Sequence, residues 1–249
     1  PAITDDTRAQ VRVLIEAIRN AMTRFEAEET MDDIKIDVPG VGAASLAQMR
    51  FGMGAEAPGG RLHAWLDMAF ASPDFDGLPK NLRRYIPTRL SIKPAITGIS
   101  TDRMFKLLMD AVTDNPDTDQ LTADAMTLVT DSGASVGLDA LSLELDALRL
   151  EGSGKLRMIA PGKAGIEARL SAAGVDELIA NAKKDPELGM AMPFLVMFRG
   201  LGKTEGNRLV WDLAITDDQA LVNGVDVMKM GAPQEQAPQK GPEKKSNKR

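Results

Sequence analysis

Hydrophobic and polar residues alternate in several short stretches of the chain, and this pattern predicts β-strands that each bury one face. The clearest stretch is 61–71, where Leu62, Leu66 and Phe70 share one face with other apolar residues, while Arg, His, Trp and Asp occupy the opposite face. The same alternation recurs in stretches 34–38, 49–53, 90–92, 141–145, 166–170 and 209–215. One-sided strands of this kind are typical of antiparallel sheets.

Three sequence signals predict turns between these strands. The alternation changes phase at Asp146–Ala147, which indicates a bulge or a tight turn. The small residues Gly152–Ser153–Gly154 favour a second turn. Asn223–Gly224 lies between two short apolar runs and predicts a two-residue hairpin of type I′, in which both residues need a positive φ angle.

Apolar residues spaced three and four apart predict helices over 5–28, from about 101 to 114, and within 174–201. The last region divides into a short helix limited by Pro186 and a more buried helix over 190–201. The polar stretch 115–125 is expected to be a connection. The chain is therefore expected to have an α+β fold, with one or more curved antiparallel sheets and three or four helices packed on one face.

The organisation of the chain suggests one folded unit over 1–231 and a basic tail over 232–249. A weak repeat at an offset of 74 residues aligns Leu82–Arg83 with Leu156–Arg157 and Asp102 with Asp176, each copy reading strand, turn, Asp, helix. It suggests two related halves, about 29–115 and 133–230, after the first helix. A chance match of generic strand–helix patterns is the alternative.

The charge distribution argues against nucleic acid as a partner. The 249-residue chain carries a formal net charge of −6, whereas its tail contains five basic and two acidic residues, so the body is acidic. Binding to a phosphate backbone needs clustered Lys and Arg on a folded face. The tail is rich in Pro, Gln and Lys and lacks apolar residues, so we expect it to be disordered and dispensable for folding.

Candidate catalytic and metal-binding motifs are weak, so we expect no enzyme activity, cofactor or metal. The sequence contains no Cys and one His, His63, which excludes thiolate nucleophiles and disfavours zinc. Gly202–Lys203–Thr204 resembles the end of a phosphate-binding loop but lacks its upstream Gly. Asp114, Asp117 and Asp119 lack the spacing of a calcium loop. A carboxylate-based hydrolase is the remaining enzymatic alternative.

The apolar strand faces are the best candidates for a binding surface. The chain has 14 Met residues and few aromatic ones, and Met adapts readily to irregular apolar surroundings. The candidate ligand-binding residues are Met49, Phe51, Met53, Leu62, Leu66, Met68, Phe70 and Trp211. Two interpretations stay open: helices cover these faces as an ordinary core, or the faces line a cavity for an apolar ligand.

The C-terminal part of the chain resembles a known group of proteins. It runs Gly137-Leu-Asp-Ala-Leu-Ser-Leu-Glu-Leu-Asp-Ala-Leu-Arg-Leu, continues through Gly174-Val-Asp-Glu-Leu-Ile, and closes with Leu221-Val-Asn-Gly-Val-Asp-Val. This pattern is similar to Gram-negative envelope proteins of the AsmA-like and YdgA-like type, in which such strands line a long curved sheet. The resemblance implies a periplasmic, non-enzymatic protein that handles lipid in outer-membrane maintenance, and its expected partners are a lipid or other apolar ligand and envelope proteins.

The resemblance also implies an inner-membrane anchor. No apolar run reaches the roughly 18 residues that a membrane-spanning helix requires, and the chain begins at Pro1. Any anchor is therefore expected in a segment upstream of Pro1. A protein-interaction or scaffold domain with a fully packed core is the alternative function.

Overall fold

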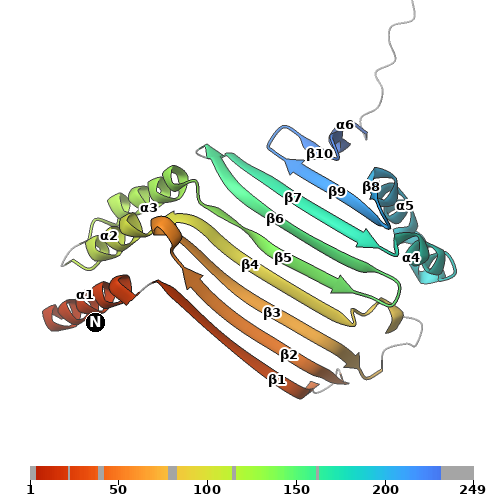
Figure 1. Ribbon diagram of the computed structural model, residues 1–249, viewed down its shortest axis with the longest axis horizontal. Coiled ribbons are helices and arrows are strands. Elements are labelled where there is room, and N and C mark those ends of the chain that lie inside the picture. Colours follow the sequence, from red (N-terminus) through yellow and green to blue (C-terminus); the bar gives the residue numbers. More distant parts are fainter. Residues whose placement is uncertain are drawn as a thin grey trace, which may run out of the picture.

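The computed structural model describes residues 4–21, 23–38, 42–77, 83–113, 116–160 and 163–230. These residues form an α+β fold around one antiparallel sheet of eleven strands, which does not close into a barrel (Figure 1). The expected tail over 232–249 lies outside the described residues. The α+β class and the antiparallel sheet of one-sided strands are confirmed.

The sheet follows the chain almost strand by strand. Its order is β1-β2-β3-β4-β5-β6-β7-β9-β10-β11, and β8 pairs with β9 only. The strands are β1 (Arg24–Val38), β2 (Gly42–Glu56), β3 (Arg61–Phe75), β4 (Arg89–Ser100), β5 (Ser135–Glu144), β6 (Arg149–Ala160), β7 (Lys163–Ala173), β8 (Lys203–Glu205), β9 (Arg208–Ile215), β10 (Ala220–Val222) and β11 (Val225–Asp226).

The described residues form six α-helices, whereas three or four were predicted. They are α1 (Asp5–Ala21), α2 (Thr101–Ala111), α3 (Thr118–Ser132), α4 (Val175–Ala182), α5 (Met192–Leu201) and α6 (Val227–Met230), with single-turn or short 3₁₀ segments at Pro58–Gly60, Arg83–Tyr85 and Pro186–Ala191. The helices α1 to α3 lie at one end of the strands, and α4 and α5 lie at the other end (Figure 1). The prediction that they cover one face of the sheet is wrong.

Two helix boundaries differ from the sequence prediction. The helix predicted over 5–28 ends at Ala21, and Phe25 belongs to β1. The stretch 115–125, predicted as a connection, contains the start of α3, whose first turn is capped by the Asp117 carboxylate accepting hydrogen bonds from the backbone N–H groups of Asp119 and Gln120. Gly133 ends α3 in the left-handed conformation, with φ of 64°.

Two of the three predicted turns are present in the structure, and one is not. A tight turn joins β5 to β6 at Asp146–Ala147, closed by the Leu145 N–H donating to the Leu148 carbonyl at 2.8 Å. Asn223 and Gly224 join β10 to β11 with φ angles of 52° and 82°, as a type I′ turn requires. The turn predicted at Gly152–Ser153–Gly154 is wrong, because these residues lie inside β6 and pair with both β5 and β7.

The two helical pairs follow strands that are equivalently placed in the sequence. Strand β4 is followed by α2 and α3, and strand β7 is followed by α4 and α5. Each element of the second set begins 74 residues after its counterpart in the first set, so that α2 begins at Thr101 and α4 at Val175. Because β4 and β7 are separated by two strands of an antiparallel sheet, they run in opposite directions. The two helical pairs consequently lie at opposite ends of the sheet.

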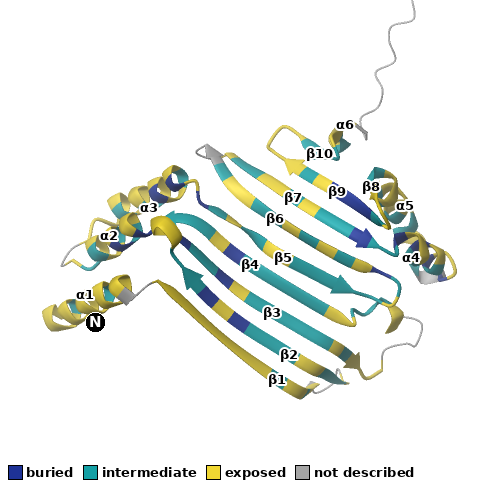
Figure 2. Cartoon of the chain, viewed as in Figure 1, coloured by how far each residue is buried: buried dark blue, intermediate teal, exposed yellow. Residues whose placement is uncertain are grey.

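The main buried core lies where α4 and α5 pack on β7 and β9. It contains Leu148, Ala172, Val175, Ile179, Leu209 and Trp211. Trp211 is fully buried, and its indole N–H donates to the Phe198 carbonyl at 2.8 Å while its ring stacks on the Phe198 ring with centroids 4.0 Å apart. A smaller buried group includes Phe105 of α2 and Leu128 of α3. Figure 2 shows that buried residues concentrate near the two helical ends and in narrow bands of the sheet.

Candidate functional site

One face of the sheet presents rows of apolar side chains that cross from strand to strand. Residues that pair directly in neighbouring strands point to the same side of a sheet. The first row crosses nine strands and is apolar throughout: Phe25, Ala55, Ala64, Ile96, Val136, Leu156, Ile166, Ile215 and Ala220. We call the side of the sheet that carries this row the apolar face.

Two further rows lie on the apolar face, further along the strands. The second row is Glu29, Phe51, Met68, Ile92, Leu141, Gly152, Leu170 and Trp211. The third row is Met31, Met49, Phe70, Leu90, Leu143, Leu150, Ala172 and Leu209. Glu29, on the edge strand β1, is the one charged residue in the three rows.

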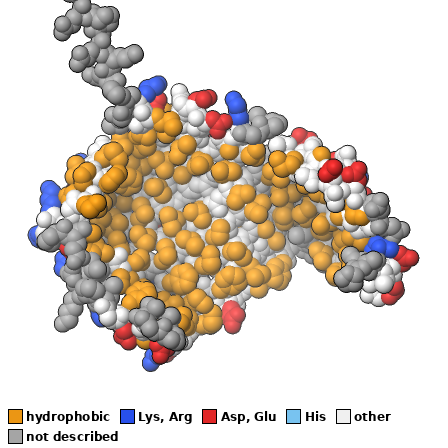
Figure 3. Space-filling view, turned by 180° about the vertical axis from the view of Figure 1, so that it is seen from behind, with side chains coloured by type: hydrophobic (Ala, Val, Ile, Leu, Met, Phe, Trp, Pro, Cys, Tyr) orange, Lys and Arg blue, Asp and Glu red, His pale blue; other side chains and the backbone are white. Residues whose placement is uncertain are grey.

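Much of the apolar face is open to solvent. Val136 is 53 % exposed, and Met53 and Leu66, which pair across β2 and β3, are each 39 % exposed. Apolar side chains spread over the hollowed surface in Figure 3, which views the molecule from behind. A contiguous apolar surface of this kind marks a site for a ligand, a partner or a membrane.

A hollow of about 260 Å³ lies near the centre of the apolar face, above β5, β6 and β7. Its lining includes Val136, Leu156 and Ile166, and its floor includes Gly152 and Gly154. A side chain at Gly152 would collide with Leu170, and a methyl group at Gly154 would lie 2.8 Å from the Ala168 Cβ. The two glycines therefore keep the floor of the hollow free of side chains.

The apolar face is closed at one corner. Leu195, Phe198 and Leu201 of α5 pack against the core that contains Trp211. Trp211, a candidate ligand-binding residue, is consequently part of the packed core and cannot touch a ligand without displacement of α5. Leu62 is also buried, with 8 % of its surface exposed.

The other six candidate residues lie together on the apolar face. Met49, Phe51 and Met53 of β2 pair with Phe70, Met68 and Leu66 of β3. Met53 and Leu66 are exposed, and the other four are half-buried. Sequence reasoning missed the first-row residues of β4 to β9, although the alternation at 166–170 and 209–215 signalled one-sided strands there.

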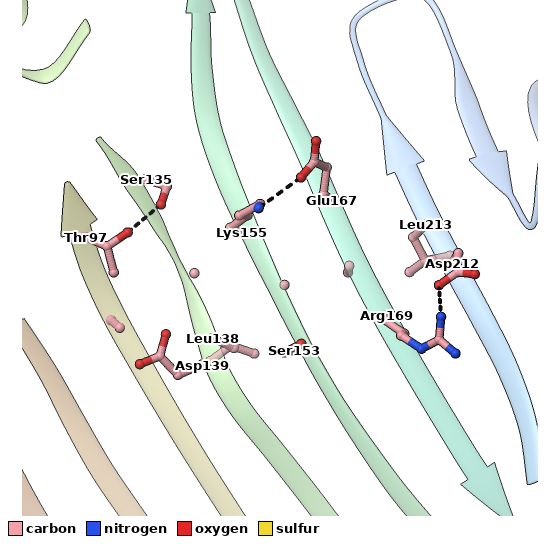
Figure 4. Close-up of a pocket in the computed structure, with 14 residues that line it drawn as sticks. Thr97, Ser135, Leu138, Asp139, Ser153, Lys155, Glu167, Arg169, Asp212 and Leu213 are labelled. Atoms are coloured by element: carbon pink, nitrogen blue, oxygen red, sulfur yellow. Dashed lines mark hydrogen bonds and ion pairs between the residues drawn. The ribbon is translucent and has the colours of Figure 1, made fainter. Parts of the chain in front are cut away.

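The opposite face carries a second, polar hollow of about 510 Å³ over β4 to β9 (Figure 4). Lys155 pairs with Glu167 at 3.2 Å, and Arg169 pairs with Asp212 at 3.0 Å. Thr97 and Ser135 share a hydrogen bond of 2.7 Å. These side chains pair with one another across neighbouring strands, so their arrangement stabilises the sheet.

His63 and Trp65 lie on this polar face, as predicted, but neither is freely exposed. His63 Nε2 lies 2.8 Å from Asp139 Oδ2, and Nδ1 lies 3.4 Å from Glu56 Oε1. Trp65 is 9 % exposed and lies over Gly54, where a side chain would collide with the indole ring, while the Lys93 ammonium sits 4.9 Å from the ring centroid. The aromatic pair is a packed structural element of the sheet.

The remaining motifs have structural roles. Lys203 and Thr204 belong to strand β8, so they cannot form a phosphate-binding loop that opens a helix. Asp117 caps α3, and Asp114 lies outside the described residues. Within the described ranges, no group of three or more His, Asp or Glu side chains is placed to hold a metal ion. No helix in those ranges is long and apolar enough to cross a membrane.

Two ion pairs that involve arginine lower the pKa of their carboxylates. Arg208 Nη1 donates to Glu151 Oε2 at 2.5 Å, which lowers the pKa of Glu151 below its ordinary value and raises the pKa of Arg208. Arg199 of α5 donates to Asp176 of α4 at 2.9 Å, which likewise lowers the pKa of Asp176. Both pairs hold packed elements together and lie away from the apolar hollow.

The geometry therefore points to the apolar face, with its glycine-floored hollow, as the candidate functional site. Comparison of the chain with protein-family models, with curated proteins and with solved structures finds no match.

Proposed function

We propose that this protein binds the hydrocarbon chains of a lipid, or a similarly apolar ligand, along the apolar face of its sheet. The observation that carries the proposal is the first row, which crosses nine strands without a polar side chain and remains largely exposed. An exposed apolar row of this length is costly to leave in water, because burial of apolar surface contributes about 25 cal/mol per Å².

The dimensions of the apolar face suit acyl chains. Neighbouring strands lie about 4.8 Å apart, so a row across nine strands extends for roughly 40 Å. The hydrocarbon core of a bilayer is about 30 Å thick, and each leaflet contributes about half of that length. The face is therefore long enough for the chains of more than one lipid, and the hollow over Gly152 and Gly154 can hold one of them.

The chemistry of the face favours recognition of hydrocarbon rather than of a headgroup. Glu29 is the one charged residue in its three rows and lies on the outermost strand. A polar headgroup would consequently stay at the margin of the sheet, in water. Specificity would then come from the length and shape of the apolar chain.

The same features support a carrier without catalytic activity. The charged groups named on the polar face pair with one another, and Lys155, which borders the apolar hollow, is paired with Glu167. The sequence resemblance to AsmA-like and YdgA-like proteins supports a periplasmic setting, in which the hollowed sheet would shield lipid from water during outer-membrane maintenance.

Binding of a fluorescent long-chain fatty acid tests the proposal directly. Val136 and Leu156 face each other across β5 and β6 and both line the hollow. Val136→Glu and Leu156→Glu should each weaken binding at least about tenfold, because a bound chain would have to bury a carboxylate. The matched control is Ser153→Glu, because Ser153 borders the hollow but is an exposed residue whose side chain lies on the polar side of the same strand.

Native mass spectrometry of the protein purified from its host provides the second measurement. Co-purified lipid that is lost in Val136→Glu but retained in Ser153→Glu would support the proposal. Equal fatty-acid binding by wild-type protein and both apolar-face variants would overturn it.

A scaffold function is the second candidate, because an exposed apolar face also suits a protein partner. The two functions predict different properties of the purified protein, namely bound lipid for a carrier and self-association for a scaffold. A wild-type protein that contains no lipid, and that forms a dimer disrupted by Val136→Glu, would favour the scaffold.

A further inference from the structure

Helix α5 and the 3₁₀ segment before it have a second apolar surface that faces solvent. Residues 188–201 contain one charged residue, Arg199, which is paired with Asp176. Met192, Leu195, Phe198 and Leu201 pack inward against the core. The outward side chains of Met190, Phe194, Val196 and Met197 are 90 %, 69 %, 52 % and 52 % exposed. This segment is therefore apolar on both sides, unlike an ordinary surface helix.

Basic residues flank this outward surface. Lys183 and Lys184 are exposed at the end of α4, and Lys203 is exposed just after α5. None of the three forms an ion pair with another residue in the described part of the chain. Basic side chains also project from this rim of the molecule, on the left of Figure 3, beside its apolar side chains.

The inward side of α5 covers one corner of the apolar face, so its outward surface lies just beyond that corner. Phe198 stacks on Trp211, and Trp211 continues the second row next to Leu170. A chain that entered along α5 would therefore meet the apolar face at its closed corner. Helix α5 therefore carries the outward surface on one side and borders the proposed lipid site on the other.

We propose that α5, with Lys183 and Lys184, docks this protein on the surface of an anionic lipid bilayer. The inference rests on the proposed function, since it names the source from which the apolar face would take its lipid. Large exposed apolar side chains beside cations are the features of an interfacial helix. Phe194 and Met197 would enter the boundary between headgroups and acyl chains, while the lysines would contact anionic headgroups.

Vesicle flotation tests the docking surface. Wild-type protein should bind vesicles of phosphatidylcholine and phosphatidylglycerol in a two-to-one mixture, and should bind pure phosphatidylcholine vesicles much more weakly. The double variant Phe194→Glu Met197→Glu should reduce vesicle binding at least about tenfold. It removes the two apolar side chains that would be buried among the acyl chains and puts carboxylates in their place. Lys183→Gln and Lys184→Gln should each reduce binding about fivefold, in a manner that salt diminishes.

A matched control shows whether vesicle binding depends on α5 in particular or on any exposed apolar side chain. Met126 of α3 is 57 % exposed at the opposite end of the sheet, so Met126→Glu should leave vesicle binding unchanged. Circular dichroism checks that each variant folds. Binding of the fluorescent fatty acid in solution should persist in the Phe194→Glu Met197→Glu variant, so loss of docking and loss of the lipid site give different results.

Three outcomes would overturn the docking proposal. Wild-type protein could float equally with neutral and anionic vesicles, or the Phe194→Glu Met197→Glu variant could bind them as wild-type protein does. Light scattering could instead show a concentration-dependent dimer that this variant abolishes, which would assign the surface to a second copy of the chain.

Discussion

Gly154 of β6 lies directly across from Ala168 of β7, and a methyl group added at Gly154 would sit 2.8 Å from the Ala168 Cβ. The same methyl group would lie 3.1 Å from the Glu167 carbonyl oxygen, which belongs to the backbone and cannot move aside easily. The closeness of the two strands here gives the hollow its floor. Gly154 is therefore a packing requirement of the sheet as well as a feature of the proposed ligand site.

Replacement of Gly154 by Ala should consequently destabilise the protein, although Ala is normally favoured over Gly. We expect a loss of about 1–3 kcal/mol in the free energy of unfolding, as for other overpacked sites. Urea denaturation measures the change. Gly200→Ala is the control, because Gly200 lies in α5 with open space around it and should gain up to about 1 kcal/mol. A neutral Gly154→Ala variant would show that β6 and β7 are further apart.

A change of side-chain size should affect stability little at Leu66 and strongly at Trp211. Leu66→Trp adds volume at a position that is 39 % exposed, so we expect a change in unfolding free energy within about 0.5 kcal/mol. Trp211→Ala removes a fully buried ring and its hydrogen bond to Phe198, and should cost about 3–5 kcal/mol. Thermal and urea unfolding measure both. A large loss in Leu66→Trp would mean that the apolar face is packed in solution.

The hairpin at Asn223–Gly224 provides a prediction about backbone strain. Gly224 has a φ of 82°, which a β-branched residue adopts only under strain. Gly224→Val should therefore destabilise the protein by about 1–3 kcal/mol in urea denaturation. Gly189→Val, at a position with open space and an ordinary φ, is the comparison. Equal effects at the two sites would contradict the turn assignment.

The Asn223 side chain ties this hairpin to the end of α5. Its Nδ2 donates to the Leu201 carbonyl at 2.7 Å and to the Val210 carbonyl at 2.9 Å. Asn223→Asp would replace these donors with a carboxylate that faces two carbonyl oxygens, so we expect a loss on the order of 3 kcal/mol. The defect should diminish at acidic pH, where protonation restores one donor. A pH-independent defect would indicate that the contacts are not formed.

The Glu151–Arg208 pair should contribute to stability in a pH-dependent way. Because the pKa of Glu151 is lowered in the folded protein, its contribution is present above the ordinary pKa of Glu and is lost as the pH falls through the folded value. Glu151→Gln should therefore be less stable than wild-type protein at neutral pH, and the difference should disappear in acid. Urea denaturation across the acidic range measures this. Arg208→Gln should show the same profile, and the double variant should add little.

The periodicity of the sequence was a reliable guide where one physical requirement decided the structure. Alternation in stretches such as 61–71 and 209–215 predicted one-sided strands, since a strand has no other way to separate its two faces. Asn223–Gly224 predicted its turn because few residue pairs tolerate two positive φ angles. In both cases local chemistry was sufficient.

The errors arose where distant contacts or weak propensities decided the structure. Gly152 and Gly154 resemble turn residues, but neighbouring strands require their small size inside β6. Helix α3 was missed because it is rich in Thr, a weak helix former. Its Thr122, Thr127 and Thr130 hydroxyls each donate to a backbone carbonyl four residues earlier.

The exposure of the apolar face could not be read from the sequence at all. Alternation shows that Met53 and Leu66 share a face, but it does not show whether a helix covers them. That outcome depends on where the helices end, and α2 and α4 leave the sheet at opposite ends. Trp211 was assigned to the ligand site for the same reason, although α5 covers it.

The strand order has a consequence for which part of the sheet unfolds first. From β1 to β7, each strand pairs with the strand before it in the chain, so each strand is held mainly by the strands next to it in sequence. Such an arrangement behaves like a one-dimensional array in which each element depends on its immediate neighbours. The β1 edge, with pairing on one side only, can separate while the corner around Trp211 stays intact. Backbone amides should therefore exchange with solvent in a gradient, fastest in β1 and slowest near β7 and β9, rather than in a single cooperative step.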